Sequence, residues 1–349
     1  MKKVLGMLMV LAMLLTMSVG ALATEEPIEV GVVWQHYDEF LTGFRLLMDQ
    51  KAEEMGGFSL TVTEAEGDQV KFFERVDAMI TRGIQNLALN PCNSTMSIEL
   101  TEKCKEAGLN VVYFNMEPMA EALEAYENQW YVGTLAADSG TMSAEMLIDY
   151  LKENGEAADH NGDGVFQIII IRGIIGHGEA EARAQAFEDA LAASGLNYEI
   201  VKYDTADHEK ALALDMMTTY ITELGLEGID GVLCGNDAMA MGAMQAVMNA
   251  GWNSGNPDEY IPITGIDATV EALEAIRTGS MEGTVLNDRE KQSEAVLKTI
   301  QLANAGTEIT EESLGMEGVT VDGRYIWVPY EKVTDDNYAD ILETLANLN

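Results

Sequence analysis

Short apolar runs alternate with segments of helical spacing along the first part of the chain. The apolar runs are rich in β-branched residues and predict buried strands, while the spacing between them predicts amphipathic helices. We expect strands at residues 28–34, 60–63, 86–89 and 111–114, and helices at residues 40–55, 70–80 and 96–107. A βα repeat of this kind folds into a parallel sheet with helices on both faces.

The same pattern then restarts and continues almost to the end of the chain. Strands are expected at residues 131–133, 166–171, 199–203, 231–234, 261–266, 284–286 and 325–329, and helices at residues 136–151, 181–193, 211–224, 238–250, 270–278 and 292–304. So many strands exceed one ordinary sheet. The predicted fold class is therefore α/β, with two doubly wound parallel-sheet lobes. No Pro- or Ser-rich linker separates the halves, which favours several short crossings.

The first 23 residues have the pattern of a secretory signal peptide. Lys2 and Lys3 precede an apolar run at residues 4–19, and residues 21–23 (ALA) fit the small-x-small rule for cleavage after Ala23. An uncleaved membrane anchor is the alternative, but the run is short for a span. We expect a mature chain that is periplasmic or extracellular, with no membrane insertion.

Composition excludes several classes of partner. The 349 residues include 20 Lys and Arg against 59 Asp and Glu, a net charge of −39 that becomes −41 once Lys2 and Lys3 are removed. Such a chain repels polyphosphates, so we expect no nucleic-acid partner. Three cysteines with no CxxC pair argue against a disulfide framework and against a cysteine-based zinc site.

Polar side chains follow the end of nearly every expected strand. Ligands of doubly wound sheets bind beyond the carboxyl ends of the strands, so these side chains are expected to converge on a cleft. A single Asn or Asp is more often a turn residue, and the inference therefore depends on their recurrence. The candidates are Trp34, Asp38, Asn90, Asn115, His177, Glu179, Arg183, Asn236, Asp237, Asp267, Asn287 and Asp288.

Five motifs recur in order along the chain: YFNMEP at residues 113–118, YVGT at 131–134, GHGEAEAR at 176–183, NDAMAMGA at 236–243 and GTVLND at 283–288. Through them the chain resembles the periplasmic sugar-binding proteins of ABC import systems, and in particular their galactose- and glucose-binding branch. The resemblance covers essentially the whole chain after the signal peptide.

The resemblance implies a type I periplasmic binding protein fold whose two lobes are joined by three hinge crossings. The first lobe would comprise residues 24–115 and about 288–318, and the second residues 116–287 and about 319–349. The implied ligand is one monosaccharide, D-galactose or D-glucose. The implied partners are the membrane permease of an ABC transporter and a chemotaxis receptor, and we expect a monomer.

Carried over position by position, the resemblance assigns sugar contacts to Asp38, Phe40, Asn90, His177, Arg183, Asn236, Asp267 and Asn287. It places Trp34 at the mouth of the site. Glu179 stands where the family has an aspartate. His208, with Asp207 as the alternative, stands where the family has a tryptophan that stacks on the sugar. The residue types fit, since carboxylates, amides and a guanidinium bind adjacent hydroxyls in pairs.

Residues 159–167 (DHNGDGVFQ) have the spacing of a calcium loop. Side-chain oxygens stand at positions one, three, five and nine, a glycine at position six and a free carbonyl at position seven. The candidate ligands are Asp159, Asn161, Asp163, Val165 through its carbonyl, and Gln167. The twelfth position is apolar Ile170, so a carboxylate must come from elsewhere, and the resemblance assigns this role to Asp230. His160, at a non-ligand position, is expected to face solvent.

Two other functions are considered. A secreted glycoside hydrolase could use two carboxylates, such as Asp38 with Glu179 or Asp267. The guanidinium of Arg183 argues against this, because it lowers the pKa of a nearby carboxyl group and a general acid needs a raised one. A sugar-responsive transcription regulator conflicts with the signal peptide and the acidic charge. The chain is therefore expected to be a binding protein and not an enzyme.

Overall fold

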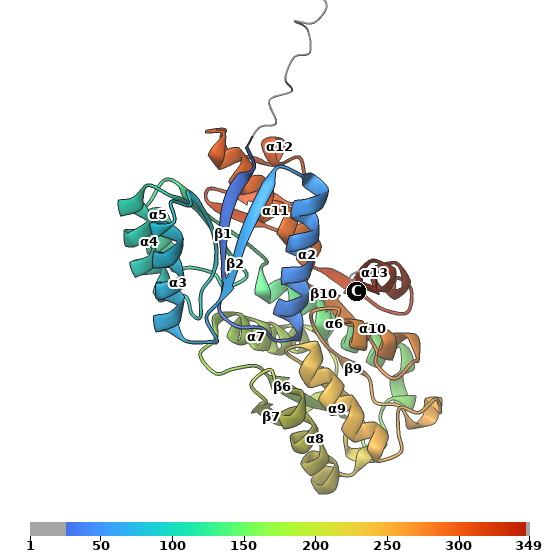
Figure 1. The fold of residues 1–349 in the computed structure, drawn as a ribbon. Coiled ribbons are helices and arrows are strands. Elements are labelled where there is room, and N and C mark those ends of the chain that lie inside the picture. The colour runs from blue at the N-terminus through green and yellow to red at the C-terminus, as the bar shows by residue number, and fades with distance from the viewer. Residues whose placement is uncertain (1–25, 347–349) are drawn as a thin grey trace, which may run out of the picture.

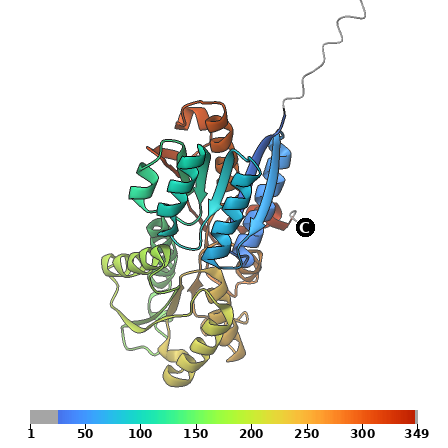
Figure 2. The same ribbon diagram turned by 60° about the vertical axis from the view of Figure 1, so that its left-hand side comes forward.

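The computed structural model describes residues 26–346, which form two lobes one above the other (Figure 1). The predicted signal peptide lies outside the described residues. Figure 2 shows the same two lobes from another side, with helices packed around the sheet of each. Within residues 26–346, no helix has the length and apolar character needed to cross a membrane.

The first lobe is built on a seven-stranded sheet in the order β11-β12-β5-β4-β3-β1-β2, parallel except for the β11–β12 pair. Its elements in chain order are β1 (Ile28–Trp34), α2 (Glu39–Met55), β2 (Phe58–Glu64), α3 (Gln69–Thr81), β3 (Asn86–Asn90), α4 (Met96–Ala107), β4 (Asn110–Phe114), α5 (Ala120–Glu124), β5 (Gln129–Gly133), α11 (Arg289–Asn304), α12 (Glu311–Leu314), β11 (Thr320–Asp322) and β12 (Tyr325–Trp327).

Alternate residues of β1 point to opposite faces of this sheet and fill two cores. Val30 and Val32 pack with side chains of α2 and α11 on one face. Val33 packs with side chains of α3 and α4 on the other face. Because both faces are covered, the central strands β1, β3 and β4 are largely apolar, which is why their sequences appear as continuous runs.

The second lobe contains a four-stranded parallel sheet in the order β7-β6-β8-β9 and a short antiparallel pair, β10–β13. Its elements are α6 (Ala136–Asn154), β6 (Phe166–Arg172), α7 (Gly178–Ala193), β7 (Tyr198–Thr205), α8 (Lys210–Leu224), β8 (Gly231–Cys234), α9 (Asp237–Asn249), β9 (Ile263–Thr264), α10 (Val270–Arg277), β10 (Thr284–Leu286), β13 (Glu331–Val333) and α13 (Tyr338–Ala346), with 3-10 turns at Gly155–Ala157, Leu226–Gly228 and Pro257–Glu259. Helices α6 and α7 cover one face of the larger sheet, and α8 and α9 cover the other.

Three crossings join the lobes. They follow the carboxyl ends of β5, β10 and β12 and lead into α6, α11 and β13. The predicted α/β class with two parallel-sheet lobes is therefore confirmed. All three crossings leave strand ends, so the ends of both sheets lie where the lobes meet.

The strand pairing corrects two of the expected lobe boundaries. The boundary placed after residue 115 moves to the end of β5, because β5 pairs in parallel with β4 of the first lobe. The boundary placed near residue 318 moves to the end of β12, because β12 pairs with β5 and carries β11 beside it. Sequence order does not show these pairings, since β12 joins the first sheet after the chain has already built the second lobe.

Candidate functional site

Polar side chains from both lobes gather at the carboxyl ends of the two sheets. We call this group the interlobe site. In the first lobe, Asp38 caps helix α2, accepting a 2.7 Å hydrogen bond at Oδ1 from the amide of Leu41. His36 lies beside it, with Nε2 3.5 Å from Asp38 Oδ2. Burial alone would raise the pKa of Asp38, but the hydrogen bonds from His36 and Leu41 lower it, so Asp38 is ionised.

Asn90 ends β3 and is completely buried. Its Nδ2 donates a 3.2 Å hydrogen bond to the carbonyl of Phe114, which fixes the orientation of the amide. Its Oδ1 is buried without a hydrogen-bond partner. A buried polar atom of this kind costs free energy unless something binds it, so Asn90 presents an acceptor that a ligand could satisfy.

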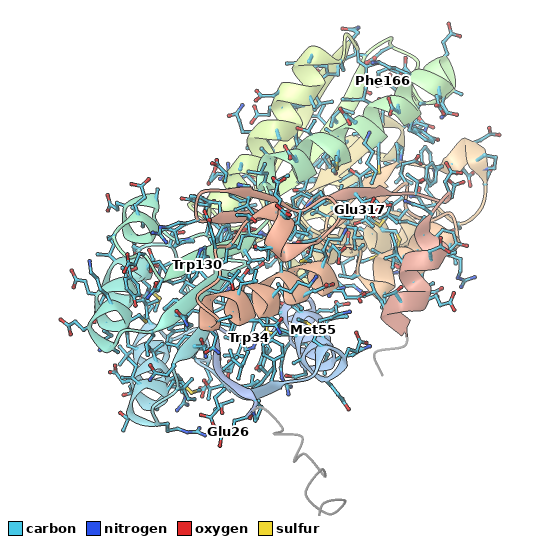
Figure 3. All side chains as sticks on the ribbon, turned by 90° about the horizontal axis from the view of Figure 1, so that it is seen from above. Glu26, Trp34, Met55, Trp130, Phe166 and Glu317 are labelled. Carbon is cyan, nitrogen blue, oxygen red and sulfur yellow. The ribbon has the colours of Figure 1, made fainter. Side chains whose placement is uncertain are left out.

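Trp34 does not lie at a mouth, contrary to the expectation. Its side chain is fully buried at the end of β1 and packs against the rings of Phe114 and Phe44, with centroids 4.7 Å and 5.5 Å away. Figure 3 places Trp34 inside the first lobe. Phe40 is half-buried, and the guanidinium of Arg289 lies 5.1 Å from the centroid of its ring.

Arg183 is the central cation of the site. Arg183 lies on helix α7 of the second lobe, and the residue is 5% exposed. Nη1 donates a 3.1 Å hydrogen bond to the carbonyl of Gly235, Nη2 donates a 3.3 Å hydrogen bond to the hydroxyl of Tyr330, and Nη2 lies 3.7 Å from Glu179 Oε2. Burial opposes its charge, but Tyr330, Asp267 and Glu179 together raise its pKa. Arg183 is therefore a buried cation and not a surface ion pair.

Asp267 is a buried carboxylate in the same region, 6% exposed, with a backbone φ of 126°. Burial, together with the like charge of Asp237, raises the pKa of Asp267 to about 7, while Arg183 and Arg289 oppose the rise. The sequence led us to expect that Arg183 lowers the pKa of nearby carboxyl groups. For Asp267 this expectation is wrong. Desolvation outweighs the charge interaction there.

Asn287 lies on the second crossing and faces Asp267. Its Nδ2 lies 3.5 Å from Asp267 Oδ1, and its own Oδ1 accepts a 2.7 Å hydrogen bond from Gln292 Nε2. Asn236 begins helix α9 as its cap, accepting a 3.0 Å hydrogen bond from the amide of Met239. The structure therefore brings these predicted residues together, each held in orientation by a neighbour.

His177 and His208 lie side by side in the second lobe. The rings of His177 and His208 meet edge to face, with centroids 5.7 Å apart. His208 packs over Gly173, where any Cβ would come within 1.9 Å of His208 Nε2, so only glycine fits beneath it. Burial, followed by the charge of Arg183, lowers the pKa of His208 to about 3, and its imidazole is neutral. The alternative residue, Asp207, is exposed and accepts a hydrogen bond from Thr205.

The lobes approach each other across this site. Asp38 of the first lobe and His208 of the second are close enough to shift each other's pKa. Of the eight buried side-chain polar atoms without a partner in residues 26–346, five belong to predicted site residues. They are Trp34 Nε1, Asn90 Oδ1, His177 Nδ1, Arg183 Nε and His208 Nε2.

Sequence reasoning missed three residues that hold the site together. Gln292 orients Asn287, Tyr330 accepts a hydrogen bond from Arg183, and Thr134 donates a hydrogen bond to Tyr330. Tyr330 stands directly after an expected strand, so the signal used for the other residues could have found it. The same signal could have found Thr134, which directly follows the strand expected at residues 131–133. Gln292 lies inside an expected helix and has no such signal.

The predicted calcium loop, residues 159–167, is ordered by its own side chains. Asp159 accepts hydrogen bonds from the amides of Gly162 and Gly164, and Gln167 bonds to both Asn161 and Asp163. These oxygen donors fit calcium in kind. In the described part of the chain, however, no three His, Cys, Asp or Glu side chains are placed to share a metal ion.

Asp230 reaches the loop but is already hydrogen-bonded to it. Its Oδ1 accepts from the amide and Nδ1 of His160, at 2.9 and 3.0 Å, and its Oδ2 accepts from the amide of Gln167 at 2.8 Å. The expectation that His160 faces solvent is wrong: its side chain is 7% exposed and packs edge-on against Trp252. The buried ring is held by Asp230 and by the carbonyl of Ile229.

Comparison with known proteins identifies the family. The model of the periplasmic binding protein domain matches residues 30–308. The D-galactose/methyl-galactoside binding periplasmic protein MglB of Haemophilus influenzae is 31% identical over 315 residues, which covers 90% of this chain and 92% of that protein.

Two solved structures share the fold. An ABC transporter solute binding protein from Bacillus halodurans with bound myo-inositol has a TM-score of 0.72 at 23% identity, covering 92% of this chain and 99% of that chain. One from Actinobacillus succinogenes with bound D-allose has a TM-score of 0.75 at 22% identity, covering 90% and 99%. These relatives are substrate-binding proteins and not enzymes. The resemblance found in the sequence is confirmed, and the chain belongs to the family of periplasmic binding proteins.

Proposed function

We propose that this protein binds one monosaccharide between its lobes and delivers it to the permease of an ABC transporter. The observation that carries the proposal is the set of four buried, unpartnered polar atoms on Asn90, His177, Arg183 and His208. Donors and acceptors are both present, since Arg183 Nε donates and Asn90 Oδ1 accepts. A sugar hydroxyl does both, so one ring bearing several hydroxyls can satisfy such a set.

D-Galactose or D-glucose is the ligand we propose, and the name of the Haemophilus influenzae relative supports galactose. The neutral, polar edge of His208 takes the place where the resemblance implies a stacking tryptophan. A cyclic polyol with a different arrangement of hydroxyls on that side is therefore a second candidate. Myo-inositol and D-allose, the ligands of the two structural neighbours, belong in the same screen.

A thermal-shift screen tests the proposal, because a ligand that binds only the folded state raises the melting temperature. Each sugar is added at millimolar concentration to the purified mature protein. At least one hexose should raise the melting temperature by several degrees, whereas mannitol, as an acyclic control, should not. If no cyclic sugar or cyclitol shifts it, the proposed ligand class is wrong.

Sugar affinity should fall as the pH falls below 7. The pKa of Asp267 is about 7 without ligand, and a sugar hydroxyl that donates to the carboxylate favours its ionised form. Binding therefore requires loss of a proton below pH 7, which weakens affinity by up to about tenfold per pH unit. Titration calorimetry between pH 5.5 and 8.5 measures this slope.

Two variants identify the group responsible. Asp267→Asn should bind sugar more weakly and lose the slope. His208→Gln should keep it, because His208 is already neutral throughout this range. An unchanged slope in Asp267→Asn would show that another group titrates.

The glycoside hydrolase alternative has no support among the relatives, which are binding proteins.

We further propose that the chain is exported after cleavage at Ala23. We also propose that it acts as a monomer and that a chemotaxis receptor is a second partner. Mass spectrometry of the exported protein tests the cleavage site: a mature chain that begins at Thr24 supports it, and an intact leader contradicts it.

We also propose one structural calcium ion at the loop of residues 159–167. Its oxygens would come from Asp159, Asn161, Asp163, Gln167 and the carbonyl of Val165. Asp230 would complete the set if its carboxylate binds the ion while it keeps its hydrogen bonds to His160. The ion would balance the carboxylates and join two distant segments of the second lobe. It would take no part in sugar binding.

A further inference from the structure

Each of the three crossings carries a buried polar side chain that bonds towards the interlobe site. Thr134 lies on the first crossing, Asn287 on the second and Tyr330 on the third, with exposures of 7%, 3% and 6%. Asn287 faces Asp267, and the other two residues bond to each other. The segments that must bend for the lobes to move are thus connected to candidate ligand-binding groups.

Tyr330 is the connecting residue. Its hydroxyl accepts a 2.7 Å hydrogen bond from Thr134 Oγ1 and a 3.3 Å hydrogen bond from Arg183 Nη2. One oxygen atom therefore joins the first crossing, the third crossing and the buried cation of the site. Burial raises the pKa of Tyr330, so the phenol is neutral.

The orientation of Arg183 depends on this contact. A guanidinium is planar, and here each terminal nitrogen has one acceptor: Gly235 carbonyl for Nη1 and Tyr330 hydroxyl for Nη2. Two such points fix the plane of the group. Nε, which is buried and unpartnered, is then held in one direction as the donor available to a ligand.

The backbone of Arg183 is tied to the first crossing as well. Helix α6 follows that crossing and packs so closely on α7 that a Cβ at Gly140 would lie 2.5 Å from the carbonyl oxygen of Arg183. The backbone of Arg183 is linked to the first crossing through the packing of α7 on α6. Its side chain is linked to the same crossing through the hydrogen bonds of Tyr330 to Arg183 and Thr134. A change in the crossing would move both the base and the tip of Arg183.

We propose that Tyr330 is a positioning residue that holds the guanidinium of Arg183 in its binding orientation and couples it to two hinge crossings. The inference rests on the proposed function, because it assumes that Arg183 contacts a sugar. Tyr330 itself acts through Arg183 and needs no contact with the ligand.

The test is Tyr330→Phe, which removes one oxygen and keeps the ring. It leaves Arg183 Nη2 and Thr134 Oγ1 without their acceptor in a buried region, so sugar affinity should fall about 10- to 100-fold. Titration calorimetry with the hexose that shifts the native melting temperature most measures the change. Tyr126→Phe is the matched control, since Tyr126 is equally buried and donates a 2.8 Å hydrogen bond to the carbonyl of Leu109 in the first lobe. It should leave affinity unchanged.

A double-mutant cycle separates positioning from a direct or purely structural role. In an Arg183→Lys background, Tyr330→Phe should change affinity less than about threefold, because the group it positions is gone. Equilibrium dialysis with labelled sugar reaches the weak affinities of this background. The same fold loss in both backgrounds, or native affinity in Tyr330→Phe, would overturn the inference.

Three further outcomes are decisive. If Tyr330→Phe does not fold, Thr134→Val takes its place: a severalfold loss that disappears with Arg183→Lys supports the coupling, and native affinity overturns it. If the native protein binds no sugar, the proposed function fails and this inference fails with it. If the native protein and Tyr330→Phe bind sugar equally, only this inference fails.

Discussion

Replacing Arg183 by alanine should weaken sugar binding more than any other single change in the site. Arg183 is the buried cation near Glu179 and Asp267, and its Nε is the unpartnered donor. Truncating one partner of a buried, hydrogen-bonded charge pair costs about 2–5 kcal/mol, or roughly 30- to 5,000-fold in affinity. Part of that loss comes from the carboxylates left without their counter-ion.

Titration calorimetry measures the effect, and Arg277→Ala is the control. Arg277 lies on α10 of the same lobe, half-exposed, and pairs with Glu274 at 2.6 Å. An exposed pair of this kind contributes little. Sugar affinity should therefore be native in Arg277→Ala and strongly reduced in Arg183→Ala. Equal affinities in the two variants would remove Arg183 from the site.

Calcium should raise the melting temperature of the native protein by about 5–10 °C when the ion is at 100 times its dissociation constant, which corresponds to about 2.7 kcal/mol. The physical reason is that the folded loop collects oxygen donors that the unfolded chain does not. Magnesium should have a smaller effect, because it requires a tighter octahedron and gives up its waters reluctantly. Sugar affinity should change little.

The readout is the difference in melting temperature between calcium and chelator. Asp230→Ala should reduce this difference, and Glu223→Ala, which breaks an exposed ion pair with Lys202, should keep it. Equal melting temperatures with and without calcium in the native protein would contradict the metal site. A full calcium response in Asp230→Ala would keep the loop as the site and remove Asp230 from its ligands.

Much of the fold could be predicted because both faces of each sheet are covered. Strand β3 was expected at residues 86–89 and is observed at Asn86–Asn90, and β4 was expected at residues 111–114 and is observed at Asn110–Phe114. Continuous apolar runs identify such strands. They do not show which sheet a strand joins, which is why β5 and β12 were assigned to the second lobe.

The residue types of the site could also be predicted, but their surroundings could not. Trp34 is buried because Phe44 and Phe114 come together around it, and neither is near it in the sequence. His160 is buried because Trp252 and Asp230 reach it from other segments. Asp267 has a raised pKa because burial outweighs the charge of Arg183, and burial depends on tertiary packing that the local sequence does not show.

Titration calorimetry of the purified native protein with D-galactose, D-glucose, D-allose and myo-inositol tests the central claim most directly. We predict one binding site per chain for at least one of these ligands, with micromolar or tighter affinity and no turnover of the ligand. No binding heat with any of the four at pH 8, from protein that melts cooperatively, would contradict the claim that the interlobe site holds a sugar.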